Sequence, residues 1–448
     1  MQANVLPLLL VFAGSYFLIK LRFFFLLHPF RTLGRGMRAL GDKRAARSFF
    51  LALAGTLGVG NVFGVALGLL IGGAGSLFWL FVSMIFAMVI KYSEVVISSD
   101  NLYHDTDTHG GFYFVIRSSF KRGARSLSAL YAAVTLAISL VMGAALQTDA
   151  VRETMCEVGD ISRLGLAVFF TLITLAAIAG GAAKIEKITA VIIPLSTLIY
   201  IFATSAIVLA NLSSLPSVLS SVIDSAFNGA SVIGGGLAFL MSAPLKEGFA
   251  RGMLSNEAGA GTSAMAHARS GVLSPASAGI LGILEVWFDT GLVCMLTGLS
   301  VLVSVDDLSR FDGGMELVMY AVGNLFGGVG KLAVLASVFA FAFATVICWY
   351  YYGTESWCAL FGRKRRIAFL PIFLSAVFLG CYIDSYTLVG ITDVLMSFAT
   401  LLTLSALIKN SDRIKALSEN GGVIDFDPGR LRPKRIKGSV FSRGERHR

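Results

Sequence analysis

The sequence predicts an all-α polytopic membrane protein with about eleven transmembrane helices. Of its 448 residues, 56% are hydrophobic and only 14% are charged, and the mean hydropathy is +0.77. A soluble chain of this length carries roughly a quarter charged residues. The apolar residues fall in blocks of about 20, the length that crosses a bilayer core, and the 48 glycines suit closely packed membrane helices.

The apolar blocks predict the spans in chain order. They cover residues 4–27, 50–72, 76–98, 126–149, 163–181, 188–211, 222–244, 275–304, 329–352, 367–384 and 387–408. The first run is too long for a signal-peptide core and no small-residue cleavage site follows it. We therefore expect it to remain as the first span.

Basic residues predict the orientation of the spans. The loop after the first span carries six of them, Arg31, Arg35, Arg38, Lys43, Arg44 and Arg47. This places the N-terminus outside the cell, and the loops near Arg117–Arg125, Lys184, Lys246–Arg269 and Arg363 inside it. The stretch 303–328 is acidic and is expected outside. The basic tail 409–448 ends in the cytoplasm, so we expect a multi-pass protein of the bacterial inner (plasma) membrane.

The net charge of +10 does not indicate nucleic-acid binding, because the basic residues lie in loops and in the tail. The tail is interpreted as solvated, with contact to anionic lipid as a minor alternative. The five cysteines have no metal-site spacing and most lie in apolar spans, so neither a disulfide framework nor a metal centre is expected.

Two of the predicted spans are interrupted by glycine. The second contains Gly58, Gly60 and Gly64, and the seventh contains Gly234, Gly235 and Gly236. Each opens a block of five spans, residues 50–211 and 222–408, after an N-terminal segment 1–49. An odd number of spans gives the two blocks opposite orientations, and paired broken helices in inverted halves indicate a transporter binding site. The alternative is two close-packed helix crossings.

Short motifs along nearly the whole chain resemble the alanine or glycine:cation symporter family. They are Gly58-Val-Gly-Asn61 with Gly64-Val65, Lys91-Tyr-Ser-Glu94, Gly110-Gly111 with Tyr113, Gln147, Gly180-Gly181 to Pro194, Arg251-Gly-Met-Leu-Ser-Asn-Glu-Ala-Gly259, Ala266-His267-Ala268, Asp289-Thr290 and Trp349 with Tyr351-Tyr352-Gly353. The Ser-Asn-Glu-Ala-Gly run is the most specific of them.

This resemblance implies a five-plus-five inverted-repeat fold, like that of the neurotransmitter:sodium symporters, with one extra N-terminal helix. It also implies ion-driven uptake of a small neutral amino acid by alternating access, with no cofactor and with sodium or a proton as coupling ion. The implied substrate contacts are Thr56, Gly58, Gly60, Asn61, Gln147, Gly234, Gly235, Thr345 and Trp349. The implied sodium contacts are the carbonyl groups of Ala54 and Leu57 and the hydroxyl group of Thr345.

The chemistry of a zwitterion fits these positions. Its carboxylate suits the amide N–H groups near Gly58–Asn61, and its ammonium group suits carbonyl oxygens near Gly234–Gly236. Trp349 would wall a small side-chain pocket; the alternative for Trp349 is ordinary packing or an interfacial anchor.

Several residues depart from the family pattern. Val59 and Ala344 replace threonines and Cys348 replaces a glycine, so hydroxyl groups that would serve sodium or substrate are missing. Asp149 and Glu285 stand where neutral residues are usual. Glu285 lies one turn before Asp289, and two buried carboxylates this close do not both ionise readily. Glu285, Asp289 and Asp149 are therefore candidates for proton coupling.

Lys91, Glu94, Asn256 and Glu257 are interpreted as gating or structural residues, and His267 as structural. Alternatives to a cation symporter are a proton-coupled or uncoupled transporter of another small solute, a transport-deficient solute-binding sensor, a channel and a membrane enzyme. The last would show a metal or nucleophile motif, and none is found. The expected partners are an amino acid and the lipid bilayer; the sequence predicts no oligomeric state.

Overall fold

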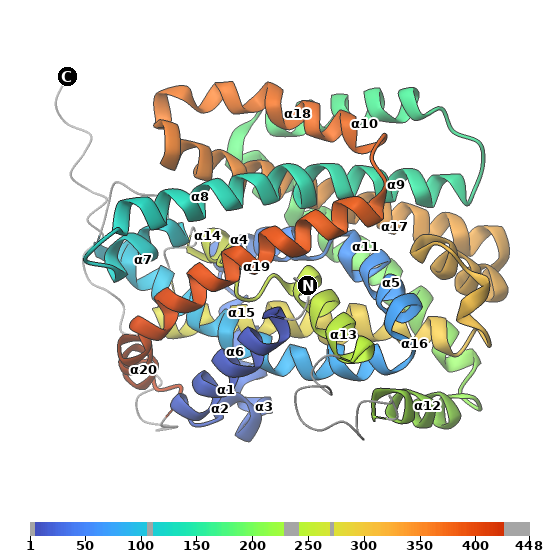
Figure 1. The fold of residues 1–448 in the computed structure, drawn as a ribbon, viewed down its shortest axis with the longest axis horizontal. Coiled ribbons are helices and arrows are strands. Elements are labelled where there is room, and N and C mark those ends of the chain that lie inside the picture. The colour runs from blue at the N-terminus through green and yellow to red at the C-terminus, as the bar shows by residue number, and fades with distance from the viewer. Residues whose placement is uncertain (1–4, 105–110, 228–241, 269–272, 425–448) are drawn as a thin grey trace.

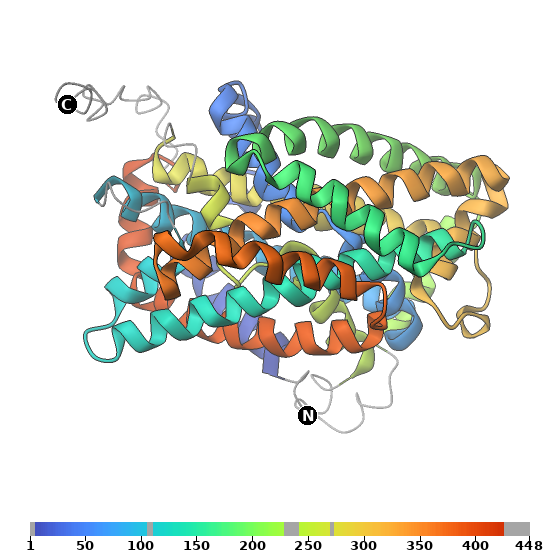
Figure 2. The ribbon, with the colours of Figure 1, turned by 90° about the horizontal axis from the view of Figure 1, so that it is seen from above.

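A computed structural model describes residues 5–104, 111–227, 242–268 and 273–424 of the chain. Within these ranges the protein is built from helices and contains no strand. The helices run largely along one long axis (Figures 1 and 2). Helices α7 (Phe112–Ser119) and α20 (Ser411–Asn420) lie at one end of this axis, and α12 (Leu215–Phe227) lies at the other (Figure 1).

The N-terminal third contains the first interrupted helix. Its elements are α1 (Val5–Lys20), α2 (Phe24–Leu27), α3 (Pro29–Ala39), α4 (Lys43–Thr56), a 3-10 turn (Val59–Asn61), α5 (Phe63–Gly72) and α6 (Gly75–His104). Asp42 caps α4 by accepting from the backbone N–H groups of Arg44 and Ala45. Helices α4 and α5 meet at an angle of 60°.

Two long helices contain π-helical segments. The first joins α8 (Ala124–Leu140) to α9 (Leu146–Cys156) through Val141–Ala145, and the second joins α15 (Pro275–Val286) to α16 (Met295–Leu302) through Trp287–Cys294. A π-helical turn inside an α-helix is uncommon and is often found at functional sites.

The remaining elements complete the bundle. They are α10 (Arg163–Ile178), α11 (Gly181–Ala210), α13 (Ala243–Asn256), α14 (Ala264–Ala268), α17 (Gly314–Phe361), α18 (Phe369–Gly380) and α19 (Ser385–Lys409), with 3-10 turns at Leu308–Arg310 and Arg363–Ala368. Helix α17 is bent at Gly327, where φ is +58°. Glycine is favoured there because a side chain is strained at such a φ.

The packing divides the interior into two groups of helices. Helix α6 packs along α13 and α15, while α17 packs along α11 and α8. The interrupted pair α4–α5 contacts both groups, since α4 touches α11, α14 and α17 and α5 touches α13 and α17. The break in α4–α5 therefore lies at the boundary between the two groups.

Among the described residues, six helices are long and apolar enough to cross a membrane, and the bent pair α4–α5 makes a seventh candidate span. They are α6, α8–α9, α11, α15–α16, α17 and α19. The predicted spans at 4–27, 163–181 and 367–384 fall on the shorter helices α1, α10 and α18. The predicted span at 222–244 lies mostly outside the described residues. The total of about eleven spans stays a prediction.

Candidate substrate and cation site

The break between α4 and α5 depends on Gly58. A Cβ atom added to Gly58 would lie 2.8 Å from Oε1 of Gln147 and 2.9 Å from Oγ1 of Thr345, so a larger residue would displace one of these side chains. The break from Leu57 to Val62 is fully buried. Unwound backbone at this depth requires polar partners, and side chains of α9, α17 and the break itself supply them.

Two side-chain amides satisfy the freed N–H groups. Oε1 of Gln147 accepts from the N–H of Val59 at 3.0 Å, and Oδ1 of Asn61 accepts from the N–H of Gly58 at 3.2 Å. The amide of Gln147 is itself oriented by a bond from its Nε2 to the carbonyl of Met142 at 3.0 Å. These are the N–H groups predicted to bind a carboxylate, so a ligand would take the place of the two side-chain oxygens.

The three groups predicted for sodium come together. The hydroxyl group of Thr345 donates to the carbonyl oxygen of Ala54 at 2.9 Å and lies 3.3 Å from that of Leu57. All three residues are buried. Neutral oxygens from a helix end and a hydroxyl group are the donor set expected for a monovalent cation in a broken helix. The neighbouring Ala344 is buried as well but offers no side-chain oxygen.

Trp349 lies directly beside the break. Its Nε1 donates to the carbonyl of Gly55 at 3.2 Å, and its ring meets that of Tyr352 edge to face at 5.3 Å. It is fully buried, which excludes the interfacial anchor as an interpretation. Thr56, also predicted to contact substrate, is buried and its hydroxyl group donates to Leu53 O at 3.3 Å.

The π-helical segment Val141–Ala145 places Gly143 against this tryptophan. A Cβ atom on Gly143 would lie 2.3 Å from Cβ of Trp349, so the glycine provides the space that the indole occupies. The same segment supplies the Met142 carbonyl to Gln147. Neither residue was predicted from the sequence, because the run Val-Met-Gly-Ala-Ala has no local signature of a π-helix.

A second interrupted segment packs against the first. Residues 257–263 separate α13 from α14, and Glu257, Gly259 and Gly261 have φ values of 54°, 94° and 72°. The end of α13 approaches the first break closely, since a Cβ atom on Gly60 would lie 3.2 Å from the carbonyl oxygen of Leu254. The predicted contacts Gly234 and Gly235 lie outside the described residues.

Asp289 connects the two breaks. Its carboxylate accepts from Nδ2 of Asn61 at 2.5 Å, from the hydroxyl of Ser255 and from that of Thr290 at 2.9 Å. Nδ2 of Asn256 donates to Oγ1 of Thr290 at 3.1 Å. One buried cluster thus joins the 3-10 turn, the end of α13 and the π-helical segment Trp287–Cys294.

Helix α6 supplies charged residues to the second break. Oε1 of Glu94 accepts from the N–H groups of Gly259 at 2.9 Å and Gly261 at 3.0 Å. Nζ of Lys91 donates to Oγ of Ser263 at 2.7 Å, and Glu257 accepts from Thr262 at 2.5 Å. The predicted gating or structural residues therefore fix the shape of the loop between α13 and α14.

The three proton-coupling candidates are not gathered in one place. Asp149 pairs with Arg152 at 2.6 Å and with the hydroxyl of Ser385 at 2.5 Å, on α9 and α19. Glu285 binds His267 and faces Lys91. Because four residues of helix advance about 6 Å, Glu285 reaches α14 and α6 while Asp289 reaches the first break.

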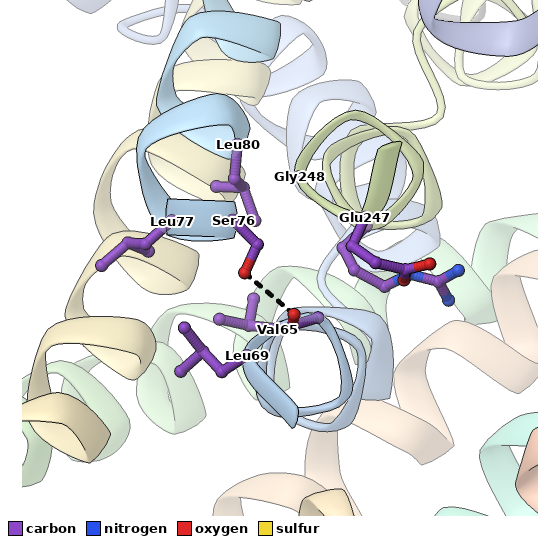
Figure 3. Close-up of a pocket in the computed structure, with 9 residues that line it drawn as sticks. Val65, Leu69, Ser76, Leu77, Leu80, Glu247 and Gly248 are labelled. Atoms are coloured by element: carbon purple, nitrogen blue, oxygen red, sulfur yellow. Dashed lines mark hydrogen bonds and ion pairs between the residues drawn. The ribbon is translucent and has the colours of Figure 1, made fainter. Parts of the chain in front are cut away.

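Arg251 is a helix residue rather than the loop residue that the orientation argument took it to be. It lies in α13 with its side chain only 4% exposed, and pairs with Asp393 of α19 at 2.7 Å and Glu247 at 3.2 Å. Figure 3 shows Glu247 of α13 facing α5 and α6 across a narrow crevice, where the hydroxyl of Ser76 donates to Gly68 O at 2.9 Å.

Comparison with known proteins decides the family. The family model described as "Sodium:alanine symporter family" matches residues 1–419. The chain belongs to the sodium:alanine symporter family. This confirms the resemblance seen in the motifs. The family is one of membrane transporters, so the chain is an integral membrane transporter and the enzyme alternative loses its support.

Relatives of this symporter cover most of its length at modest identity. It is 28% identical over 397 residues to the "Sodium/proton-dependent alanine carrier protein" of Bacillus sp. (strain PS3), covering 84% of this chain and 87% of the relative. It is 28% identical over 379 residues, or 82% of each chain, to the "Sodium/alanine symporter AgcS" of Methanococcus maripaludis. It is also 28% identical over 417 residues to an "Uncharacterized transporter" of Haemophilus influenzae, covering 90% and 91%.

The predicted site residues of the symporter thus form three adjoining buried networks. Gln147, Thr345 and Trp349 surround the first break, Asn61 and Asp289 join it to the second, and Lys91, Glu94 and Glu285 lie around the second. Ser255, Thr290 and Gly143 belong to these networks and were missed. For Ser255, a signal was available in the Ser-Asn-Glu-Ala-Gly motif, of which only Asn256 and Glu257 were given a gating or structural role.

Proposed function

We propose that the protein takes up a small neutral amino acid, such as alanine or glycine, by cation symport with alternating access. The observation that carries this proposal is the meeting of the Thr345 hydroxyl with the carbonyls of Ala54 and Leu57, next to the buried Trp349. A cation and a small solute would then bind side by side at a broken helix. Membership in the sodium:alanine symporter family supports the same substrate class.

We further propose eleven spans, arranged as one extra N-terminal helix followed by two inverted halves of five. The halves correspond to the predicted segments 50–211 and 222–408, after 1–49 and before the tail 409–448. Two interrupted helices support this arrangement. Helices α4–α5 lie in the first half and α13–α14 lie in the second, and the two pairs pack against each other. The N-terminus would lie outside the cell and the C-terminus in the cytoplasm, in a bacterial inner membrane.

The substrate carboxylate would bind the N–H groups of Gly58 and Val59, displacing the amide oxygens of Asn61 and Gln147. The carbonyl oxygen of Leu254 faces Gly60. We assign this oxygen as a partner of the substrate's ammonium group. Trp349 would restrict the side-chain pocket to a small substituent, since Gly143 leaves room for the indole alone.

Sodium would be held by Ala54, Leu57 and Thr345, with a proton as the alternative coupling ion. Proton coupling has specific support, because a histidine–carboxylate pair is buried between α14 and α15. The relative from Bacillus sp. (strain PS3), by its name, depends on both ions.

Uptake into proteoliposomes tests the proposal. Purified protein should exchange labelled alanine for internal alanine without any ion gradient, and an inward sodium gradient should drive accumulation. Exchange that does not saturate with substrate would indicate a channel. Substrate binding in detergent without exchange would indicate a solute sensor, and either result would reject the symporter proposal.

A further inference from the structure

A histidine and a carboxylate form a buried pair outside the proposed substrate and sodium contacts. Nε2 of His267 in α14 lies 2.6 Å from Oε2 of Glu285 in α15. The other carboxylate oxygen, Oε1, lies 3.5 Å from Nζ of Lys91 in α6. The three side chains are at most 1% exposed. The pair therefore joins α14, α15 and α6 at one point.

More ionisable groups face this point from the surrounding elements. Those that interact electrostatically with Glu285 or Lys91 are Glu94 of α6, Glu257 of the second break, Asp289 of the π-helical segment, and Cys348 and Tyr352 of α17. If His267 were neutral and every acidic group ionised, the charges of Glu94, Glu257, Glu285 and Asp289 would be opposed, within the described residues, by Lys91 alone. Such an excess of buried charge is very costly within a membrane. The cluster must therefore hold at least one proton.

The geometry indicates where an exchangeable proton resides. Glu285 faces both Lys91 and His267, two side chains that can carry a positive charge, and these stabilise its anionic form. Histidine is the residue type whose charge ordinarily changes between pH 5 and 8. The two can alternate between carboxylate with neutral imidazole and carboxylate with imidazolium.

The ligand of this site is a proton rather than a metal cation. Lys91 and His267 both present nitrogen atoms toward Glu285, and the ammonium group of Lys91 repels any further cation. The neutral oxygens at Thr345 lack such a competitor and suit sodium better.

We propose that His267 and Glu285 form a proton-binding site whose occupancy is coupled to transport. The inference rests on the proposed transport function. Protonation of His267 converts its hydrogen bond with Glu285 into an ion pair, which tightens α14 against α15. Because α14 follows directly on the second break, the loop 257–263 that Glu94 and Lys91 hold would become more rigid as the proton binds. The proton enters from one aqueous side and leaves to the other as the site alternates.

Counterflow and pH-gradient-driven uptake, measured in the same proteoliposomes, test the inference. In wild-type protein an acidic exterior should raise alanine uptake by about fivefold or more at fixed sodium, the lower range of coupling between sites. The lumen should acidify when alanine is added, as reported by a trapped pH dye. Glu285→Gln and His267→Gln should retain counterflow but lose both effects. Glu153→Gln is the matched control, because that carboxylate contacts Arg152 on α9, away from the pair.

The outcomes separate the two proposals. Wild-type counterflow without any effect of the pH gradient overturns the proton site and leaves the symporter proposal standing. Variants that keep the effect also overturn it. Absence of wild-type counterflow rejects the transport function, and this inference with it.

If neither variant folds, the wild type still decides. Its alanine affinity in detergent should change between about pH 5.5 and about pH 8 by linkage, and protons should be taken up or released when alanine binds in weak buffer. An affinity that is constant over this range rejects the site.

Discussion

The hydroxyl group of Thr345 is the side-chain oxygen that meets the carbonyls of Ala54 and Leu57 at the end of α4. Val59 and Ala344, where the family pattern suggested threonine, are both buried and contribute no hydroxyl. Threonines at positions 59 and 344 would have supplied two further hydroxyl groups. Without them, the proposed cation site depends more strongly on Thr345.

Replacing Thr345 by valine tests this dependence. Thr345→Val keeps the shape but removes the oxygen, so the sodium concentration for half-maximal uptake should rise about tenfold, equivalent to about 1.4 kcal/mol. Thr354→Val is the control, since its hydroxyl bonds within the same helix to Tyr350 O at 2.7 Å and lies outside the site. Equal sodium dependence in the two variants would reject the proposed cation site.

Gly143 permits a second test at a single residue. Gly143→Ala would bring a methyl group into Trp349, and such overpacking typically costs about 1–3 kcal/mol. We expect a lower thermal unfolding midpoint and about tenfold slower uptake. Gly390→Ala in α19 should do neither, because nothing lies within 4 Å of the added Cβ atom. Unchanged uptake by Gly143→Ala would mean that transport does not depend on the present position of Trp349.

At the scale of elements, the sequence predicted the first break and missed the one at residues 257–263, while the break predicted at Gly234–Gly236 lies outside the described residues. Gly58 and Gly60 interrupt a long apolar run. Glycine is unfavourable in the interior of a helix, so these residues predicted a break. Residues 255–263 are small and polar and follow a short helix, so they were interpreted as a loop. Their place became apparent only from the bond between Asn61 and Ser255 and from the bonds to Glu94. Such tertiary contacts have no periodic signal in a single sequence.

The buried ion pair between α13 and α19 gives a prediction at this scale. Arg251→Met would leave the carboxylates of Asp393 and Glu247 without their cation, and breaking a buried pair in this way costs about 3–5 kcal/mol. Asp393→Asn should cost less, because Arg251 keeps Glu247. Thermal unfolding in detergent would measure both effects.

The control for this pair is Asp412→Asn. Asp412 is 95% exposed and pairs with Lys20, and water screens the pair, so its loss should leave the unfolding midpoint almost unchanged. If Arg251→Met shifted the unfolding midpoint no more than Asp412→Asn, the ion pair would not be holding α13 to α19.

At the scale of the whole molecule, two groups of helices meet along the broken pair α4–α5. Helices α6, α13 and α15 form one group, and α8, α11 and α17 form the other. A relative movement of the two groups would open the break to one side at a time. The apolar pattern of the sequence predicted the long helices well, but not this division, because lipid-facing and protein-facing apolar residues are alike in composition.

Native cysteines can report the proposed orientation. Cys156 is exposed at the end of α9, which we place outside, and Cys358 is partly exposed near the basic turn Arg363–Ala368, which we place inside. A membrane-impermeant maleimide should label Cys156 in right-side-out vesicles and Cys358 only after permeabilisation. Cys156→Ser should abolish the first signal. The opposite order of labelling would invert the proposed topology.

The π-helical segment at Trp287–Cys294 has a practical consequence for mapping this protein by mutagenesis. Each residue of an α-helix turns by about 100°, and one wide turn delays that rotation by about one residue. A single helical wheel drawn from Pro275 to Leu302 would therefore assign α16 to the wrong side. Scanning experiments along this helix should use two wheels, one ending at Val286 and one starting at Met295, and the same holds for α8 and α9 on either side of Val141–Ala145.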